Sequence, residues 1–283
     1  MQPVLQKHWR TSRQWHPPEP LRTVAEAVLA VCVTVLVGII SAAPTPAAEP
    51  PDPSVRLFDT GSHEALVRPD MVATRKGWTQ VPEGRLDHRF AGDAALMNDK
   101  IAIVFERTGT LFRCFAFGDV VRERVMARPH PPTTGEYQLK VIENSAAAVE
   151  VEAADENPGY PDTAFRLRLT AGEAVVEMRP APGMEKVTLH WGRKDVVVPD
   201  FFGDDMVLTS EVARLRPIAV PAENVLLALD AVGMIVCVRE GGDRGADLCP
   251  SPYAATLKGA DPICTIPGRG GKRLWLALLD GPD

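Results

Sequence analysis

Apolar and polar residues alternate with a period of two over much of the chain after residue 55, whereas helical periodicity is scarce there. The clearest case is Ala164–Thr170, in which a phenylalanine and two leucines share one face and two arginines share the other. A turn with a central glycine follows at 171–173, and Ala174–Arg179 resumes the alternation. This pattern predicts a β-hairpin.

Similar apolar runs recur along the chain, most of them bounded by Gly, Pro, Asn or Asp. They are Lys100–Phe105, Leu111–Phe117, Tyr137–Ile142, Ala147–Glu152, Val187–Trp191, Val225–Leu229, Met234–Arg239 and Leu274–Leu279. Many short strands without intervening amphipathic helices are typical of an all-β fold rather than of βαβ units. We therefore predict an antiparallel β-sandwich, preceded by one N-terminal apolar helix.

The N-terminal part of the chain has a different character from the rest. Ala27–Ala43 contains no charged residue, and a tail with four basic residues precedes it. Basic residues on the cytoplasmic side of an apolar segment are the pattern of exported proteins. The segment is longer than a common signal-peptide core and short for a membrane span, so a cleaved signal and an uncleaved anchor both remain open.

These patterns divide the chain into four predicted parts. They are a basic cytoplasmic tail at 1–23, a transmembrane anchor or signal-peptide core at 24–43, a proline-rich linker at 44–54 and a β-sandwich domain at 55–283. The linker is expected to be extended, because its prolines fix φ and lack a backbone N–H. The sandwich is expected outside the cytoplasm, either anchored to the membrane or secreted after cleavage.

The net charge bears on the partners of the sandwich. The whole chain carries −6 and the first 22 residues carry +3, so the remainder carries −9. An acidic domain repels phosphate backbones at long range, which argues against nucleic acid as a partner. The expected partners are the membrane, through the N-terminal segment, and a polysaccharide.

Four cysteines lie in the predicted exported part: Cys114, Cys237, Cys249 and Cys264. The last three are close enough in sequence for one pair among them to form a disulfide in an oxidising compartment. The alternative is that all four are small buried apolar residues. Their spacing is not that of a zinc site.

Part of the chain resembles a known fold family. The stretch Ala164–Phe202, with its hairpin and following strand, resembles segments of galactose-mutarotase-like supersandwich domains, as do Met97–Ala102 and Pro221–Asn224. Such domains accompany many polysaccharide-active enzymes. The resemblance covers less than half of the chain and implies a fold class; no catalytic residue is carried over from it.

The richest acidic cluster is Asp200, Asp204 and Asp205, in a glycine-containing segment. Calcium is bound by several carboxylate and carbonyl oxygens that converge on one point, so this cluster is the candidate calcium site. The competing interpretation is a solvated turn, because the spacing is not that of an EF-hand.

Other candidate residues fit glycan chemistry. His190 and Glu223 are the catalytic candidates, as acid or base, and Trp191 and Tyr160 are candidate ligand-binding aromatics. On an alternating strand His190 and Trp191 point to opposite faces, so they cannot both line one site without a bulge. The pairs at 63–64 and 87–88 place a histidine beside an acid in the same way.

Two functions follow from these observations. The first is an exported β-sandwich module that binds carbohydrate or another component of the cell envelope, and the absence of GxSxG, HExxH and phosphate-loop motifs favours it. The alternative is a glycan-active lyase or hydrolase, or the accessory domain of one, with an acidic and calcium-binding site. The sequence does not decide whether the protein is an enzyme.

Overall fold

The structure is a computed structural model. It describes residues 53–63, 66–107, 111–130, 136–155, 164–182, 184, 186–199, 205–215, 218–220, 224–240, 247–250, 262–267 and 272–280. All of them belong to the second of the two units into which the chain divides, Pro51–Asp283. The predicted tail, the apolar segment and most of the linker lie outside the described residues. Within these ranges no helix is long and apolar enough to cross a membrane.

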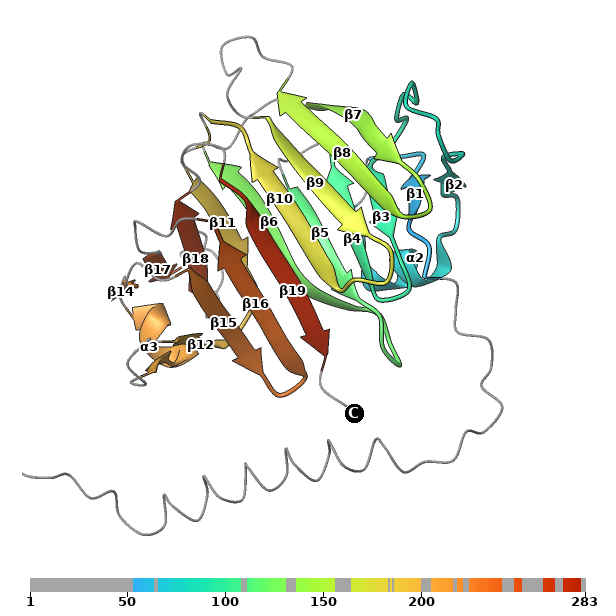
Figure 1. Ribbon diagram of the computed structural model, residues 1–283. Helices are drawn as coiled ribbons and strands as arrows, with labels where there is room; N and C mark the ends of the chain where they lie inside the picture. The colour runs from blue at the N-terminus through green and yellow to red at the C-terminus, as the bar shows by residue number, and fades with distance from the viewer. Residues whose placement is uncertain are drawn as a thin grey trace, which may run out of the picture. The chain divides into compact units, whose positions relative to one another are not determined.

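The described strands form two antiparallel sheets, which confirms the predicted fold class (Figure 1). One sheet has ten strands in the order β14-β17-β18-β11-β6-β5-β4-β3-β1-β2. Its strands are β1 (Arg56–Asp59), β2 (Thr79–Gln80), β3 (Ala94–Met97), β4 (Ile101–Glu106), β5 (Leu111–Ala116), β6 (Arg122–His130), β11 (Lys186–His190), β14 (Ile218–Ala219), β17 (Asp247–Pro250) and β18 (Pro262–Pro267).

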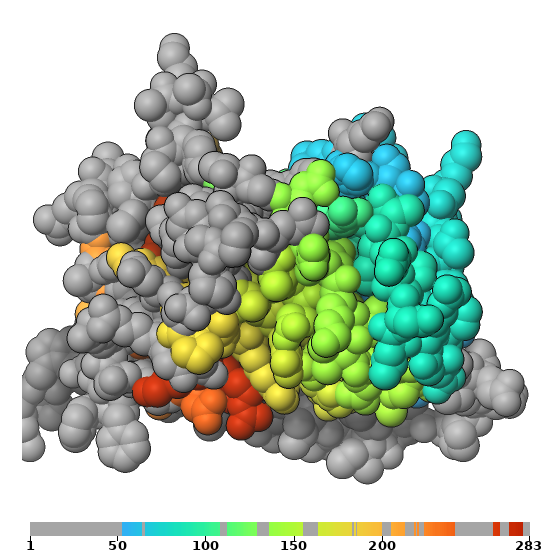
Figure 2. All heavy atoms as spheres, turned by 90° about the horizontal axis from the view of Figure 1, so that it is seen from above, coloured from blue at the N-terminus to red at the C-terminus, as the bar shows by residue number. Residues whose placement is uncertain are grey.

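The second sheet has nine strands in the order β13-β12-β15-β16-β19-β10-β9-β8-β7. They are β7 (Tyr137–Asn144), β8 (Ala148–Asp155), β9 (Phe165–Thr170), β10 (Val175–Pro180), β12 (Asp195–Val198), β13 (Met206–Leu208), β15 (Val225–Asp230), β16 (Gly233–Arg239) and β19 (Leu274–Asp280). Figure 2 shows the early residues of the unit, in blue and cyan, at one end, and β19, in red, beside the yellow residues near the middle.

The two sheets pack face to face around one main core, to which strands of both contribute. Four aromatic rings join the layers: Phe105 and Phe112 from the ten-stranded sheet meet Tyr137 and Phe165 from the nine-stranded sheet. The rings of Phe105 and Phe165 are stacked, with centroids 4.8 Å apart, and Tyr137 meets Phe165 edge-on at 5.7 Å. Buried aromatic contacts of this kind stabilise the fold by more than their buried apolar area alone accounts for.

The predicted hairpin is confirmed as β9 and β10. Leu169 pairs with Val176 and Leu167 with Met178, so the buried residues of both strands face the core. Gly172 in the turn has φ of 69°, a left-handed conformation that glycine adopts without a steric penalty. The eight further predicted runs overlap β4, β5, β7, β8, β11, β15, β16 and β19 in turn, and are also confirmed.

The sequence pattern did not predict β3, and the structure gives the reason. All residues of β3 and β4 are buried on both faces, because the short helix α2 (Pro69–Thr74) packs over the outer face of the ten-stranded sheet. A second, smaller core forms beneath that helix. It contains Phe58, Val67, Val72, Ala95, Met97, Ala102, Val104 and Phe115. The other described helix, α3 (Ser210–Leu215), is also short.

The structure decides between the two interpretations of the cysteines. Cys114, Cys237 and Cys264 are buried and form no disulfide. Each possible disulfide among Cys237, Cys249 and Cys264 would include Cys237 or Cys264. Neither of these two residues forms a disulfide, so the expected bridge is not formed. Burial raises the pKa of Cys237 to about 12, and a thiol of this kind behaves as an inert apolar residue.

Asn98 connects the two sheets through hydrogen bonds. Its side-chain amide N–H groups donate to the carbonyl oxygens of Thr170 (2.9 Å) and Glu173 (2.7 Å) in the β9–β10 turn. Its side-chain oxygen accepts from the backbone N–H of Lys100 and Ile101, both at 2.9 Å. Asn98 is only 8% exposed, so these groups cannot exchange their partners for water.

Substitution Asn98→Ala is expected to lower the free energy of unfolding by about 2–4 kcal/mol, because it removes two donors and leaves two buried N–H groups without an acceptor. Asn98→Asp retains the acceptor but loses both donors, and should also be destabilised. Urea denaturation of the purified protein and both variants measures these changes. An Asp variant as stable as the wild type would show that the link between the sheets contributes nothing.

Candidate functional site

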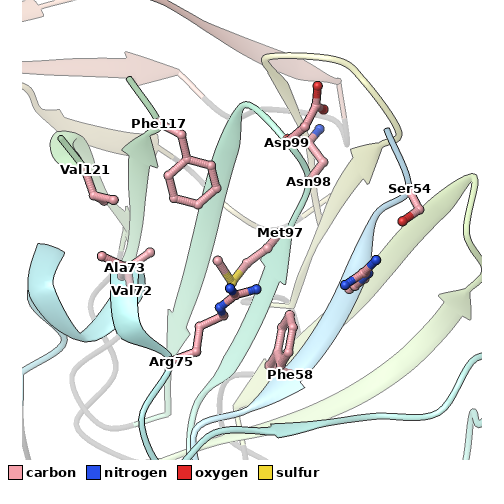
Figure 3. A pocket seen from close by; sticks show the side chains of 11 residues that line it. Ser54, Phe58, Val72, Ala73, Arg75, Met97, Asn98, Asp99, Phe117 and Val121 are labelled. Carbon is pink, nitrogen blue, oxygen red and sulfur yellow. The ribbon is translucent and has the colours of Figure 1, made fainter. Parts of the chain in front are cut away.

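A cavity lies on the outer face of the ten-stranded sheet, beside α2. It has a volume of about 490 Å³ and is called here the α2 pocket (Figure 3). Phe58, Val72, Met97, Phe117 and Val121 form its apolar part, and Ser54, Arg56, Arg75 and Asp99 form its polar part. A mainly apolar cavity with a few polar groups is the common form of a small-molecule binding site.

Strand alternation explains how β1 contributes to this pocket. Leu57 faces the main core, so its neighbours Arg56 and Phe58 point to the outer face. Met97 ends β3 on the same face, and Figure 3 shows it between the rings of Phe58 and Phe117. The two rings therefore flank the pocket from β1 and from the segment after β5.

Helix α2 closes the pocket on its other side. Pro69 opens the helix, which suits its fixed φ and missing N–H. Arg75 ends the helix in a left-handed conformation, with φ of 51°, and its backbone N–H donates to the carbonyl of Met71 at 2.8 Å. Helices commonly end in this way, but the residue is usually glycine.

The Arg75 side chain lies against an aromatic wall of the pocket. Its guanidinium carbon is 6.0 Å from the ring centroid of Phe58, within the range of a cation–π interaction. The Phe58 ring is supported by Trp78, whose ring centroid is 6.3 Å away. The pocket thus presents a positive group held above an aromatic surface.

Asp99 provides a negative group on the same pocket. Its Oδ1 atom is buried and has no hydrogen-bond partner in the structure. A buried carboxylate oxygen without a donor costs free energy, and Asp99 is one of the residues that line the pocket. The neighbouring Asn98 also lines the pocket, but its amide is fully used between the sheets.

The structure separates the candidate residues derived from the sequence. His190 ends β11 on the outer face, while Trp191 is 4% exposed and belongs to the main core, so the indole ring has little surface to offer a ligand. Asp205 is exposed. Four candidates lie outside the described residues: Tyr160, Asp200, Asp204 and Glu223.

Calcium binding by the acidic cluster stays a prediction, because two of its three aspartates are not described. Among the residues that the structure does describe, no group of three or more His, Cys, Asp or Glu side chains is placed to hold a metal ion.

A buried ion network lies near His190 on the same sheet. The Arg113 guanidinium donates to Glu106 through Nε and to Glu123 through Nη1, both at 2.7 Å. Burial raises the pKa of Glu106, although Arg113 opposes this shift. One arginine therefore holds both carboxylates.

Burial lowers the pKa of His190 to about 4, and the positive charges of Arg128 and Arg113 add to this effect. The imidazole is therefore neutral at pH 7. In the unfolded chain it would bind a proton near pH 6.5. Native stability is therefore lost as the pH falls from 6.5 toward 4, because only the unfolded state takes up the proton there.

Replacement His190→Gln removes this proton linkage. The wild type should lose up to about 3 kcal/mol relative to the variant between pH 7 and pH 4. Urea denaturation of both proteins at half-unit pH intervals measures the difference. Stability curves that run parallel over this range would show that the histidine is not held in its neutral form.

His88 pairs with Asp59, 29 positions away in the sequence, rather than with its neighbour Asp87. His88 Nε2 lies 2.9 Å from Asp59 Oδ2, and the same carboxylate accepts backbone N–H bonds from Gly61, Ala91 and Gly92. Burial raises the pKa of Asp59, but these four hydrogen bonds outweigh it and lower the pKa below its ordinary value. The carboxylate therefore holds the 88–92 loop to β1.

The sequence did not indicate the α2 pocket. Its residues come from β1, α2, β3 and the segment after β5, and none of them belongs to a recognisable motif. The pair Asn98–Asp99 was noted only as part of a pattern before a strand. A signal was present in Arg75, which follows a short helical segment at the place where glycine is usual.

Comparisons with known proteins find distant structural likenesses only. No protein-family model matches the chain, and no curated protein matches it. A mutant glycoside hydrolase of family 81 from Clostridium thermocellum aligns with 68% of this chain and 21% of its own length, at 11% identity and a TM-score of 0.38.

Two other solved structures are similar to the same degree. The ligand-free α-N-acetylgalactosaminidase from Bifidobacterium bifidum aligns with 67% of this chain and 36% of its own, at 12% identity and a TM-score of 0.44. An α-mannosidase from Enterococcus faecalis aligns with 72% of this chain and 31% of its own, at 9% identity and a TM-score of 0.44. The chain spans about a third or less of these glycoside hydrolases, and likenesses this distant do not assign it to a family.

Proposed function

We propose that the β-sandwich is a carbohydrate-binding module and that the α2 pocket is its binding site. The observation that carries this proposal is the combination, in one cavity of about 490 Å³, of two aromatic rings with a buried carboxylate oxygen that lacks a donor. The pocket has room for about one or two sugar units, in line with the usual size of small-molecule sites.

The chemistry of a sugar matches both features of the pocket. A saccharide has apolar C–H faces, which pack on the rings of Phe58 and Phe117, and hydroxyl groups, which donate to an acceptor such as Asp99. A purely apolar ligand would leave the Asp99 carboxylate without a donor. A ligand with hydroxyl groups removes that cost on binding.

Substitution Asp99→Ala tests the proposal. It should weaken saccharide binding about tenfold or more, because the bound hydroxyl loses a charged acceptor. The fold should be as stable as the wild type or slightly more stable, since the variant removes a buried oxygen that has no partner. The matched control is Asp87→Ala, whose carboxylate is 87% exposed and is paired only with Arg85 on the surface.

An array of defined neutral and acidic oligosaccharides, probed with the full chain and both variants, measures binding. Thermal melting of the same three samples measures stability. Binding that is lost in the Asp99 variant and kept in the Asp87 variant supports the site. The proposal fails if the wild type retains no saccharide, or if the Asp99 variant binds like the wild type.

The proposed module works outside the cytoplasm, and the support for this is the charge-free segment Ala27–Ala43 behind a basic tail. In a bacterial host the full chain should fractionate with the membrane or the extracytoplasmic space, and a variant without residues 24–43 should stay in the cytoplasm. N-terminal sequencing of the mature protein distinguishes a cleaved signal from an anchor. Equal cytoplasmic recovery of both forms would contradict export.

A further inference from the structure

We infer that the saccharide bound in the α2 pocket is acidic and that Arg75 recognises its negative charge. This inference rests on the proposed function and adds the chemical class of the ligand to it. The pocket is lined by two arginines, Arg56 and Arg75, and by one aspartate, Asp99. The net charge of these three side chains is positive, whereas the chain after residue 22 carries a net charge of −9.

The backbone of Arg75 is the first observation that singles out this residue. Among the described residues it is the only one other than glycine with a positive φ. A side chain in this conformation costs about 1 kcal/mol relative to glycine, which is the usual residue at this position of a helix end. Backbone strain of this kind is found preferentially at functional sites, so the arginine side chain is retained here at a cost in stability.

The surroundings of the guanidinium are the second observation. Arg75 is exposed, and its recorded contact is the face of Phe58, with no ion pair to a described carboxylate. Arg68, which precedes α2 and does not line the pocket, by contrast pairs with Asp70 at 3.2 Å. The Phe58 ring therefore holds the Arg75 guanidinium in place, and the guanidinium N–H groups remain available to a ligand.

The geometry of the pocket separates the two charged contacts. Figure 3 shows Arg75 and Asp99 on opposite sides of Met97. A carboxylate or sulfate on one side of a sugar could accept two parallel hydrogen bonds from the planar guanidinium of Arg75. Hydroxyl groups on the other side of the sugar could donate to the Asp99 carboxylate. The same arrangement places the sugar's C–H face over the apolar centre of the pocket. A neutral sugar would leave the guanidinium without a charged partner.

The test uses substitution Arg75→Gly, which removes the guanidinium and introduces the residue best suited to a left-handed helix end. This variant should melt at the same temperature as the wild type or higher. Arg75→Lys retains the charge without the planar fork. The matched control is Lys76→Ala, which removes a neighbouring exposed positive charge that does not line the pocket.

Isothermal titration of the full chain and these variants uses four probes: oligogalacturonate, its methyl ester, a sulfated galactan oligosaccharide and a neutral galactan oligosaccharide. We expect the wild type to bind at least one charged probe about tenfold or more tightly than the neutral forms. Oligogalacturonate as the tighter probe identifies a carboxylate ligand, and sulfated galactan identifies a sulfate ligand. The preference should fall below about threefold in the Arg75→Gly variant and remain unchanged in the Lys76→Ala variant.

The outcomes distinguish this inference from the proposed function. Equal binding of charged and neutral probes, abolished by Asp99→Ala, would overturn the acidic ligand and leave a carbohydrate-binding site. A charge preference that survives in the Arg75→Gly variant would overturn the role of Arg75. No binding of any probe by the wild type, together with no binding on the array, would overturn both.

Discussion

The contact between the inner faces of the two sheets is the interaction on which the rest of the structure depends. Each sheet by itself would expose one complete apolar face to water, and neither would be stable alone. Stacking of Phe105 on Phe165 and the edge contact of Tyr137 with Phe165 fix the layers near one end of the sandwich. Asn98 adds a polar link close to the same region, because it bonds the β3–β4 turn to the β9–β10 turn.

The outer face of the ten-stranded sheet has a different organisation, and it is there that the candidate site lies. The six-residue helix α2 covers only part of that face. Beneath it a second core forms around Phe58, Met97 and Phe115. At the edge of this core the strands of the sheet extend beyond the part that α2 covers. The α2 pocket occupies the space beside the helix. A cavity thus arises where a short helix is too small for the sheet that it covers.

Buried polar groups have two distinct roles in this fold. Asp59 is stabilised by three backbone N–H groups and His88, so its carboxylate is ionised and holds a loop in place. Arg113 similarly joins Glu106 and Glu123 across neighbouring strands. Asp99 differs from these groups because its buried oxygen has no donor. Other buried polar atoms, such as Trp191 Nε1, also lack a partner, but Asp99 is the one of these residues that lines the α2 pocket.

The sequence by itself determined the all-β class and the hairpin of β9 and β10, because alternation with a period of two is a local property that a chain expresses before it folds. It predicted most strands of the nine-stranded sheet, and β4 although that strand is buried on both faces, but it missed β1, β3 and β6 among others. It also did not reveal the α2 pocket or the pairing of His88 with Asp59. These features join residues from distant segments, and only the packing of the sheets and of α2 brings them together.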